Sequence, residues 1–367
     1  MKKDPEHGKR NNHKMKPYIV LQYLLKYTDE NHTASATDII DFLKENDILA
    51  ERRSIYRDIE EINRVNVMQE EDCTLDEADE MIAEDEELKL VHYDKNKKGF
   101  YIKQRHYNFN DIRLLAECVY SAKFLSKKQA KRLSDVVCGF VSDFQAEKIQ
   151  HDALLTDRVK TANNAVFNNI AIINDAMSKE VDGEKHVPEK ISFNYLKYTI
   201  ADISQQVTRR HGEKYFVSPY KLLINDGNYY LLAFDDRSQK MRTYRVDRMK
   251  DVSYTGEPRE GAEAFAAIDM KTYTTRVFSM FGGKQERVTM QFINPLLDAV
   301  VDRFGNERGN ANYYRADDNH FCVSADIEIS DQFYGWILGF GNKAKILGPN
   351  AVVQSFKKYL DNIQKMY

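Results

Sequence analysis

The stretch from residue 190 to residue 256 limits the fold of this chain more than any other feature. It contains ISFNYLKYTI, YFVSPYKLLIN, NYYLLAFDD and MRTYRVDRMKDVSY, runs in which apolar or aromatic residues alternate with polar ones. Turn residues separate these runs, and the alternation predicts half-buried β-strands. Several short strands in so little sequence predict a small barrel or a tightly bent sheet.

The last of these runs concentrates arginine. Side chains alternate along a strand, so Arg242, Tyr244, Val246 and Arg248 are expected on one face and Arg245 on the other. Two arginines beside an aromatic ring form a site for a phosphate and a stackable base. This arrangement points to an anionic, base-containing ligand.

A purely structural role explains part of the same segment. Leu231 and Val246 are assigned to the core, and Arg245 has Asp247 and Asp251 as nearby acidic partners. Arg242 and Arg248 are expected together on the first face. Because paired arginines on a small sheet need an anion, they keep the functional interpretation.

The stretch resembles the WYL domain, whose pattern is a Pro, a Gly before Trp-Tyr-Leu, and then Arg-x-Phe/Tyr-Arg-x-x-Arg. The matching residues are Pro219, Gly227, Tyr229, Tyr230, Leu231, Arg242, Tyr244, Arg245 and Arg248, with Tyr229 in place of Trp. The resemblance implies a small SH3/Sm-like β-barrel that senses a nucleic-acid-like or nucleotide ligand. The expected effector-binding residues are Ser218, Tyr220, Tyr230, Arg242, Tyr244, Arg245 and Arg248.

Near the N-terminus, the first sixteen residues carry six Lys/Arg and no apolar periodicity, which predicts a basic tail. Three helices are expected after it. The first starts at Pro17, the second opens at Thr37 or Asp38, and the third covers residues 51–64. Isoleucines at helical spacing form the buried stripe of the third helix.

The opposite face of the third helix carries arginines. Its Arg53-Ser54-Ile55-Tyr56-Arg57-Asp58 resembles the Arg-Thr-Ile-Tyr-Arg-Asp signature of winged helix-turn-helix regulators of the DeoR and WYL kind. The resemblance implies DNA contacts from the recognition helix and from a basic wing tip, with Asp58 fixing the helix locally. The expected DNA-binding residues are Arg52, Arg53, Ser54, Tyr56, Arg57, Lys95, Lys97 and Lys98.

Charge alone favours a different interpretation, a solvated helix face with Arg–Glu pairs. Residues 1–65 carry twelve basic and twelve acidic side chains. Residues 66–90 then hold eleven Asp/Glu against one Lys, which is unsuited to direct DNA contact. This block interrupts the usual succession of recognition helix and wing. It is interpreted as an insertion, partly helical, that points away from DNA or inhibits binding without ligand.

Further helices are expected over residues 110–125, 126–142 and 163–179, with Ser126 as a cap. The C-terminal part reads strand 287–292, helix 295–304, strands 312–316 and 321–328, helix 331–340, strand 344–347 and helix 350–366. The order βαββαβ is ferredoxin-like. It resembles the WCX-type extension that follows WYL domains, and its apolar helix faces also suit a dimer interface.

The predicted fold class is therefore α+β and multidomain. A winged helix-turn-helix occupies residues 15–106, including the acidic insertion at 66–90, and a helical linker covers 107–162. The WYL barrel occupies 163–257, and the C-terminal ferredoxin-like unit occupies 284–367. In the mechanism this implies, ligand bridges Arg242, Arg248 and Tyr220, and the helices of residues 107–180 relay the change to paired winged heads.

The remaining patterns bear on compartment and chemistry. Four widely spaced cysteines predict free thiols in a reducing cytoplasm, and no metal site or cofactor is expected. No apolar run is long enough to span a membrane. Walker, GxGxxG, HExxH and GxSxG motifs are missing from the sequence, so an enzyme is not expected.

The leading prediction is a cytoplasmic, homodimeric transcription regulator that binds double-stranded operator DNA and a nucleotide-like effector. The alternative is an RNA- or single-stranded-DNA-binding protein, or a CRISPR-associated accessory protein, that works through the same barrel. A regulator depends on Arg53 and Arg57, whereas the accessory protein depends on Arg242 and Arg248.

Overall fold

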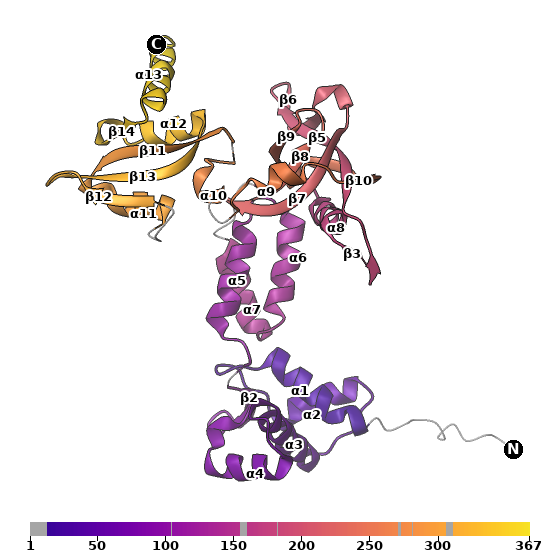
Figure 1. Cartoon of the computed structure of the whole chain (residues 1–367). Helices are drawn as coiled ribbons and strands as arrows, with labels where there is room; N and C mark the ends of the chain where they lie inside the picture. Colours follow the sequence, from indigo (N-terminus) through magenta and orange to yellow (C-terminus); the bar gives the residue numbers. More distant parts are fainter. Residues whose placement is uncertain are drawn as a thin grey trace. The chain divides into compact units, whose positions relative to one another are not determined.

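The structure, a computed structural model, describes residues 13–103, 105–154, 160–181, 183–270, 273–280, 282–305 and 311–367. It divides into two compact units, residues 1–160 and residues 161–367. Figure 1 traces the elements of both units in chain order. Most of the predicted basic tail lies outside the described residues.

The first unit opens with three helices and a hairpin around a shared core. The helices are α1 (Lys16–Tyr27), α2 (Ala36–Glu45) and α3 (Arg52–Glu70). Strands β1 (Val91–Asp94) and β2 (Gly99–Ile102) pair antiparallel, and Ala34 bridges to Phe100. The core includes Val20, Leu24, Ile39, Leu43, Ile55, Ile59, Ile62, Val91, Phe100 and Ile102. The isoleucine stripe of the third helix is therefore buried as predicted.

Helix α2 begins earlier than predicted. Its N-cap is Ser35, whose hydroxyl accepts the backbone N–H of Asp38, while the Asp38 carboxylate accepts the N–H of Ser35. Placing the cap at Thr37 or Asp38 was wrong, because Asp38 is the third helical residue of a capping box and has cap chemistry itself.

The acidic block is mostly helical and packs on the core helices. Helix α3 continues to Glu70, six residues beyond its predicted end, because Val67 is buried and nothing after Arg64 breaks the helix. Helix α4 (Leu75–Glu84) and a 3-10 turn (Glu86–Leu88) follow. Arg64 joins α3 to α4 through Asp79, with Nε 2.6 Å from the carboxylate oxygen.

A bundle of three helices completes the first unit: α5 (Phe109–Ser121), α6 (Lys127–Cys138) and α7 (Asp143–Leu154). Ser126 caps α6 as predicted. The predicted helix 126–142 instead stops at Cys138, because Gly139 follows, and α7 was missed. The Ser142 hydroxyl accepts the N–H of Gln145 at 3.1 Å and so starts the missed helix.

Short contacts tie this bundle to the first three helices. The Ser142 hydroxyl donates to the Asp29 carboxylate at 2.5 Å, and Arg105 donates to the carbonyls of Leu25 and Thr28, both at 2.7 Å. The His32 ring stacks on Phe144, with centroids 3.7 Å apart. The end of α1 is thus fixed to the start of α7.

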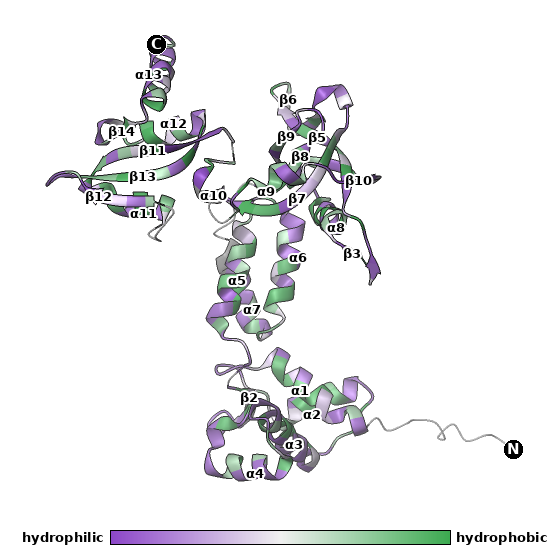
Figure 2. Cartoon of the chain, viewed as in Figure 1, coloured by the Kyte–Doolittle hydropathy of each residue, from purple (hydrophilic) through white to green (hydrophobic). Residues whose placement is uncertain are grey.

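The second unit begins with α8 (Val166–Met177), largely hydrophobic in Figure 2, and the small hairpin β3 (Glu180–Val181) and β4 (Glu184–Lys185). A curled antiparallel sheet follows. Its strands are β5 (Glu189–Thr199), β6 (Asp202–Thr208), β7 (Tyr215–Asn225), β8 (Asn228–Asp235), β9 (Lys240–Arg245) and β10 (Met249–Pro258). The strand order is β10-β5-β7-β8-β9, with β6 paired to β5. Helix α8 packs on β5, β7 and β10.

Two short helices, α9 (Ala262–Ala266) and α10 (Tyr273–Arg276), lead to the C-terminal sheet. That part contains β11 (Lys284–Ile293), α11 (Leu297–Phe304), β12 (Ala311–Arg315), β13 (His320–Ile329), α12 (Asp331–Leu338), β14 (Ala344–Gly348) and α13 (Asn350–Gln364). The strand order is β12-β13-β11-β14. Every strand and helix predicted here is present close to its predicted bounds. The helices contribute Val300, Phe333 and Val352 to one core with the sheet.

Candidate functional site

The first candidate surface is the outer face of α3. Arg53 and Arg57 are exposed, one turn apart, while Ile55 and Ile59 between and beside them are buried. In the part of the chain that the structure describes, neither arginine has a carboxylate within ion-pair distance. The helix therefore presents two guanidinium groups that are available to an anion.

Asp58 and Ser54 both contact Lys16 within the protein. The Asp58 carboxylate is buried against the ammonium of Lys16, 2.9 Å away, at the start of α1. Ser54 also contacts that ammonium through its hydroxyl. Asp58 thus has the local fixing role that the sequence predicted, while Ser54, predicted to meet DNA, is half-buried and partnered by Lys16.

Tyr56 is half-buried between α3 and the hairpin. Its ring lies 5.0 Å from that of Phe100 and 6.3 Å from that of Tyr93, measured between centroids. The exposed Arg52 lies beside Tyr56, and this contact raises the pKa of Arg52. Tyr56 consequently sets the position of the hairpin against the helix, and its hydroxyl end borders the arginine face.

The hairpin tip carries Lys95, Lys97 and Lys98, all exposed. The Asp94 carboxylate accepts the N–H groups of Asn96 and Lys97, which lowers the pKa of Asp94 and orders the turn. The Lys97 ammonium donates to the Asn31 carbonyl at 2.9 Å. Two of the three predicted lysines therefore remain without a protein partner among the described residues.

Acidic side chains of residues 66–90 form ion pairs with nearby basic side chains. Arg64 pairs with Asp79 and Glu61, Lys103 with Glu87, and Lys89 with Glu86. Among the residues that the structure describes, exposed cations without an ion pair include Arg53 and Arg57 of α3, Lys95 and Lys98 of the hairpin tip, and Lys44 of α2. The acidic segment therefore leaves the arginines and the hairpin lysines of the signature surface unneutralised.

The second candidate site is a cluster of arginines and tyrosines in the curled sheet. The Arg245 guanidinium forms a two-pronged pair with buried Asp247, at 3.0 and 2.8 Å. The hydroxyl of buried Tyr195 accepts the backbone N–H of Arg245, and the Arg209 guanidinium lies 5.4 Å from the Tyr195 ring. Arg248 belongs to the same cluster, because its charge lowers the pKa of both Tyr195 and half-buried Tyr230.

The pKa values of the two tyrosines reflect this setting. Burial raises the pKa of Tyr195 and of Tyr230, while Arg248 opposes that rise in each. Both phenols therefore remain neutral hydrogen-bonding groups near half-buried guanidinium groups. Such a cluster can hold a phosphate or carboxylate and stack a planar base.

The predicted strand alternation fails beyond Arg245. Strand β9 ends there, and residues 246–248 form a 3-10 turn. The Asn163 amide donates to the carbonyls of Asp247 and Met249, and the buried Asn169 amide donates to the Met249 carbonyl. These bonds replace strand pairing, so Arg248 is positioned by the turn rather than by a shared strand face with Arg242.

Several predicted effector contacts are engaged elsewhere. The Ser218 hydroxyl accepts the N–H of Glu260, and the Tyr220 hydroxyl donates to the Glu260 carbonyl. The buried Tyr244 hydroxyl donates to Asp235 at 2.6 Å. Arg242 is exposed and donates to the Ser238 hydroxyl. The structure therefore gathers Tyr230, Arg245 and Arg248, and gives the other predicted residues separate partners.

Sequence reasoning missed two members of the cluster. Tyr195 was not singled out, although it alternates with Phe193 along a predicted strand. Arg209 is also not among the predicted effector-binding residues. The neighbouring Arg210 lies with its guanidinium 3.8 Å from the Tyr215 ring. The sequence signal that could have identified them is an arginine at the end of a strand that follows a strand with alternating aromatic residues.

The described residues contain no group of three His, Cys, Asp or Glu side chains placed to bind a metal ion. Within the described ranges, helices with the length and apolar character of a membrane span are also missing.

Comparison with known protein families defines the second unit. A WYL domain matches residues 189–254, and a WCX domain matches residues 284–364. The chain therefore contains a WYL domain, and a WCX domain follows it. This pair of domains is consistent with a regulator of the WYL type.

Two solved structures resemble the chain distantly. Proteasome accessory factor B/C (PafBC) of Arthrobacter aurescens has 14% identity and a TM-score of 0.27, over 100% of this chain and 51% of that one. The chain thus spans about half the length of PafBC. A CRISPR Cas-related protein has 13% identity and a TM-score of 0.32, over 91% of this chain and 92% of that one. No curated protein matches the chain.

Proposed function

We propose that this protein is a ligand-responsive transcription regulator that binds double-stranded operator DNA through α3 and the β1–β2 hairpin. The observation that carries the proposal is the division of α3. Its isoleucine face is buried, and its other face offers two unpaired arginines beside a lysine-rich hairpin tip. A recognition helix requires this division, because one face packs and the other meets base edges and phosphates.

The proposal interprets residues 15–106 as a winged helix-turn-helix. The order of three helices and a hairpin, with the Ala34–Phe100 bridge, supports it. Helix α3 would enter the major groove with Arg53 and Arg57, and Lys95 and Lys98 would meet flanking phosphates. Ser54 and Lys97 take a smaller part, because both already have partners in the protein.

The sheet of residues 189–254 is proposed to bind the effector, a nucleotide or another nucleic-acid-like anion. The cluster of Arg209, Tyr230, Arg245 and Arg248 supports this role, since it combines guanidinium groups with aromatic rings. Arg248 is the residue best placed for a phosphate, because Arg245 is already held by Asp247. The sequence predicted that the ligand bridges Arg242, Arg248 and Tyr220, and of these three residues the proposal keeps Arg248.

The other parts of the proposal concern architecture. The sheet of the WYL domain is proposed to be SH3/Sm-like, and the strand order β12-β13-β11-β14 supports a ferredoxin-like C-terminal domain. The working protein is proposed to be a homodimer that reads two half-sites. Its role is regulatory rather than enzymatic, and it is proposed to act in the cytoplasm.

The test selects double-stranded DNA from a random pool with the full chain, followed by gel shifts with Arg53→Ala/Arg57→Ala. The proposal expects a selected sequence that the wild type shifts and the double variant does not. Lys128→Ala/Lys131→Ala removes two exposed cations of α6 and is the matched control, expected to bind like wild type. Failure to select any duplex sequence would contradict the proposal.

The second candidate function is binding of RNA or single-stranded DNA through the WYL domain, as an accessory protein. The arginine–tyrosine cluster favours it, because stacking and guanidinium contacts suit unpaired bases. It predicts that Arg245→Ala/Arg248→Ala abolishes single-strand binding while the α3 double variant binds normally. The regulator predicts the reverse dependence for duplex DNA.

A further inference from the structure

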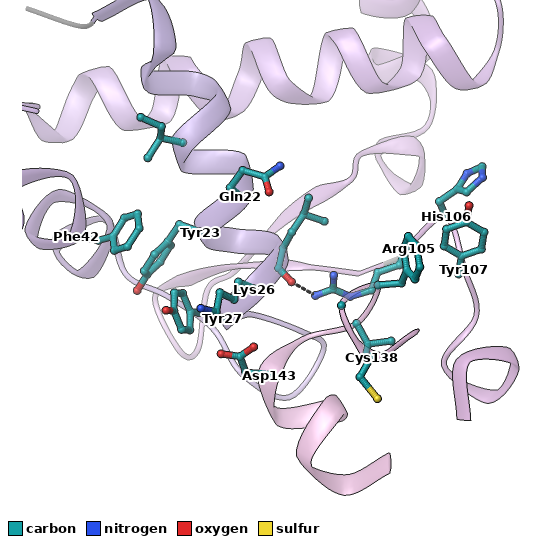
Figure 3. A pocket seen from close by; sticks show the side chains of 15 residues that line it. Gln22, Tyr23, Lys26, Tyr27, Phe42, Arg105, His106, Tyr107, Cys138 and Asp143 are labelled. Carbon is teal, nitrogen blue, oxygen red and sulfur yellow. Dashed lines mark hydrogen bonds between the residues drawn. The ribbon is translucent and has the colours of Figure 1, made fainter. Parts of the chain in front are cut away.

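A cleft of about 580 Å³ lies in the first unit between α1 and the corner that joins α6 to α7. It is separate from the α3 face and from the arginine–tyrosine cluster of the second unit. Its volume falls within the range of about 300–1,000 Å³ that is typical of small-molecule sites. Figure 3 shows Tyr23, Tyr27 and Phe42 on one side of it and Arg105, His106 and Tyr107 on the other.

The walls of the cleft are aromatic. The ring centroid of Tyr23 lies 4.7 Å from that of Phe42 and 5.0 Å from that of Tyr27. On the other side, Tyr107 and Phe140 meet edge to face at 5.0 Å, and both are about half exposed. Exposed aromatic rings that face a concave space favour a flat, apolar ligand group.

Arg105 supplies the polar feature. One of its terminal nitrogens donates to the carbonyls of Leu25 and Thr28, which fixes the guanidinium at the cleft wall (Figure 3 draws one hydrogen bond of Arg105 as a dashed line). Burial lowers the pKa of Arg105, and Asp29 opposes that shift. Among the described residues no carboxylate lies within ion-pair distance of Arg105.

The charge of Asp29 reaches Arg105, but the hydrogen bonds of its carboxylate go to other groups. The Asp29 carboxylate accepts hydrogen bonds from Ser142 and His32. The charge of Asp143 raises the pKa of Lys26. His106 lies 3.6 Å from Glu70. A fixed guanidinium that is half removed from water, and that no carboxylate of the described residues contacts, is suited to bind a carboxylate.

We propose that this cleft binds a small aromatic carboxylate, with the carboxylate on Arg105 and the ring between the two aromatic walls. The site is a second ligand site of the chain and does not depend on the proposed effector site or on DNA binding. Its position beside the Asp29–Ser142 contact places a ligand at the junction of α1 and α7.

The test is saturation-transfer NMR on the full chain with aromatic carboxylates from benzoate to naphthalene-2-carboxylate, each compared with its carboxamide. At least one carboxylate is expected to bind in the millimolar range or tighter, and its amide at least about tenfold more weakly, because the charge-assisted bonds are lost. Phe140→Ala and Arg105→Gln are expected to weaken binding about tenfold each.

Two controls assign the binding to the cleft. Leu114→Ala removes an exposed apolar side chain of α5 outside the cleft and should leave binding unchanged. Arg245→Ala/Arg248→Ala should also leave it unchanged. No binding by any carboxylate, equal binding of the amides, or loss of binding only in the Arg245/Arg248 variant would overturn the proposal. The last result would support the effector site, so the two proposals fail separately.

Discussion

The arginines of helix α3 and those of the curled sheet are held in different ways. On α3, the buried carboxylate of Asp58 pairs with Lys16, a residue of another helix, and leaves Arg53 and Arg57 exposed. In the sheet, the buried carboxylate of Asp247 pairs with Arg245 itself, and tyrosine rings surround the cluster. Exposed cations suit a long polyanion, whereas half-buried, oriented ones suit one small anion in one pose.

The comparison has a physical basis in solvent access. Both buried aspartates cost desolvation energy and require a cation. The Lys16–Asp58 pair is closed to water, with side chains 9% and 12% exposed, whereas the Arg245 side chain of the other pair is 26% exposed. The Lys16–Asp58 pair therefore has a structural role, whereas the Arg245–Asp247 pair leaves an edge of the guanidinium that a ligand can reach.

The largest expected effect comes from breaking the closed pair. Lys16→Met leaves the Asp58 carboxylate buried without a cation and should lower the free energy of unfolding by about 3–5 kcal/mol. Urea denaturation of the full chain, followed by circular dichroism, measures this. The double variant Lys16→Met/Asp58→Asn should recover a large part of the loss. Equal stability of Lys16→Met and wild type would show that the pair is not closed to water.

Breaking the open pair should cost less. Asp247→Ala removes the partner of Arg245, which can turn toward water, so a loss of about 2–3 kcal/mol is expected, below the range for a fully buried pair. The same denaturation experiment applies. Lys250→Ala, at an exposed position of β10 in the same sheet, is the control and should change stability little. A loss for Asp247→Ala larger than that for Lys16→Met would reverse the comparison.

The hairpin that accompanies α3 depends on a close approach at Gly99. A Cβ added there would lie 2.7 Å from the Thr33 hydroxyl oxygen and 2.8 Å from the Thr33 Cβ. Gly99→Ala should therefore disturb the Ala34–Phe100 bridge and destabilise the protein by about 1–3 kcal/mol. Gly256→Ala meets no atom within 4 Å but has a positive φ, so it reports the cost of backbone strain alone. A smaller effect at Gly99 than at Gly256 would contradict the crowding argument.

The smallest effect is on salt dependence and sharpens the difference between the two arginine sets. Arg53→Ala should reduce the slope of log K against log salt for duplex binding by about 1, since one phosphate or base-edge contact disappears. Arg248→Ala should leave that slope unchanged and instead weaken binding of a mononucleotide about tenfold. Filter binding at a series of salt concentrations and calorimetry measure these two quantities. A change of slope for Arg248→Ala would mean that the sheet itself contacts the duplex.

The sequence by itself determined the elements whose signals are local. Alternating aromatics predicted the strands of residues 190–256, and helical spacing predicted the buried isoleucines of α3. The C-terminal order of strands and helices was also correct, because each element there has a clear period and a turn residue at its end. The WYL resemblance, carried by residues such as Gly227 and Arg245, was correct for the same local reason.

Only the tertiary structure decided how these side chains are grouped. The alternation rule placed Arg248 with Arg242, but Asn163 and Asn169, distant in sequence, hold residues 246–248 in a turn. Helix α7 and the cap at Ser35 depended on hydrogen bonds that composition does not reveal. The aromatic cleft beside Arg105 combines residues from α1, α2 and the α6–α7 corner. Periodicity specifies which face of an element is buried, whereas long-range packing specifies what that face meets.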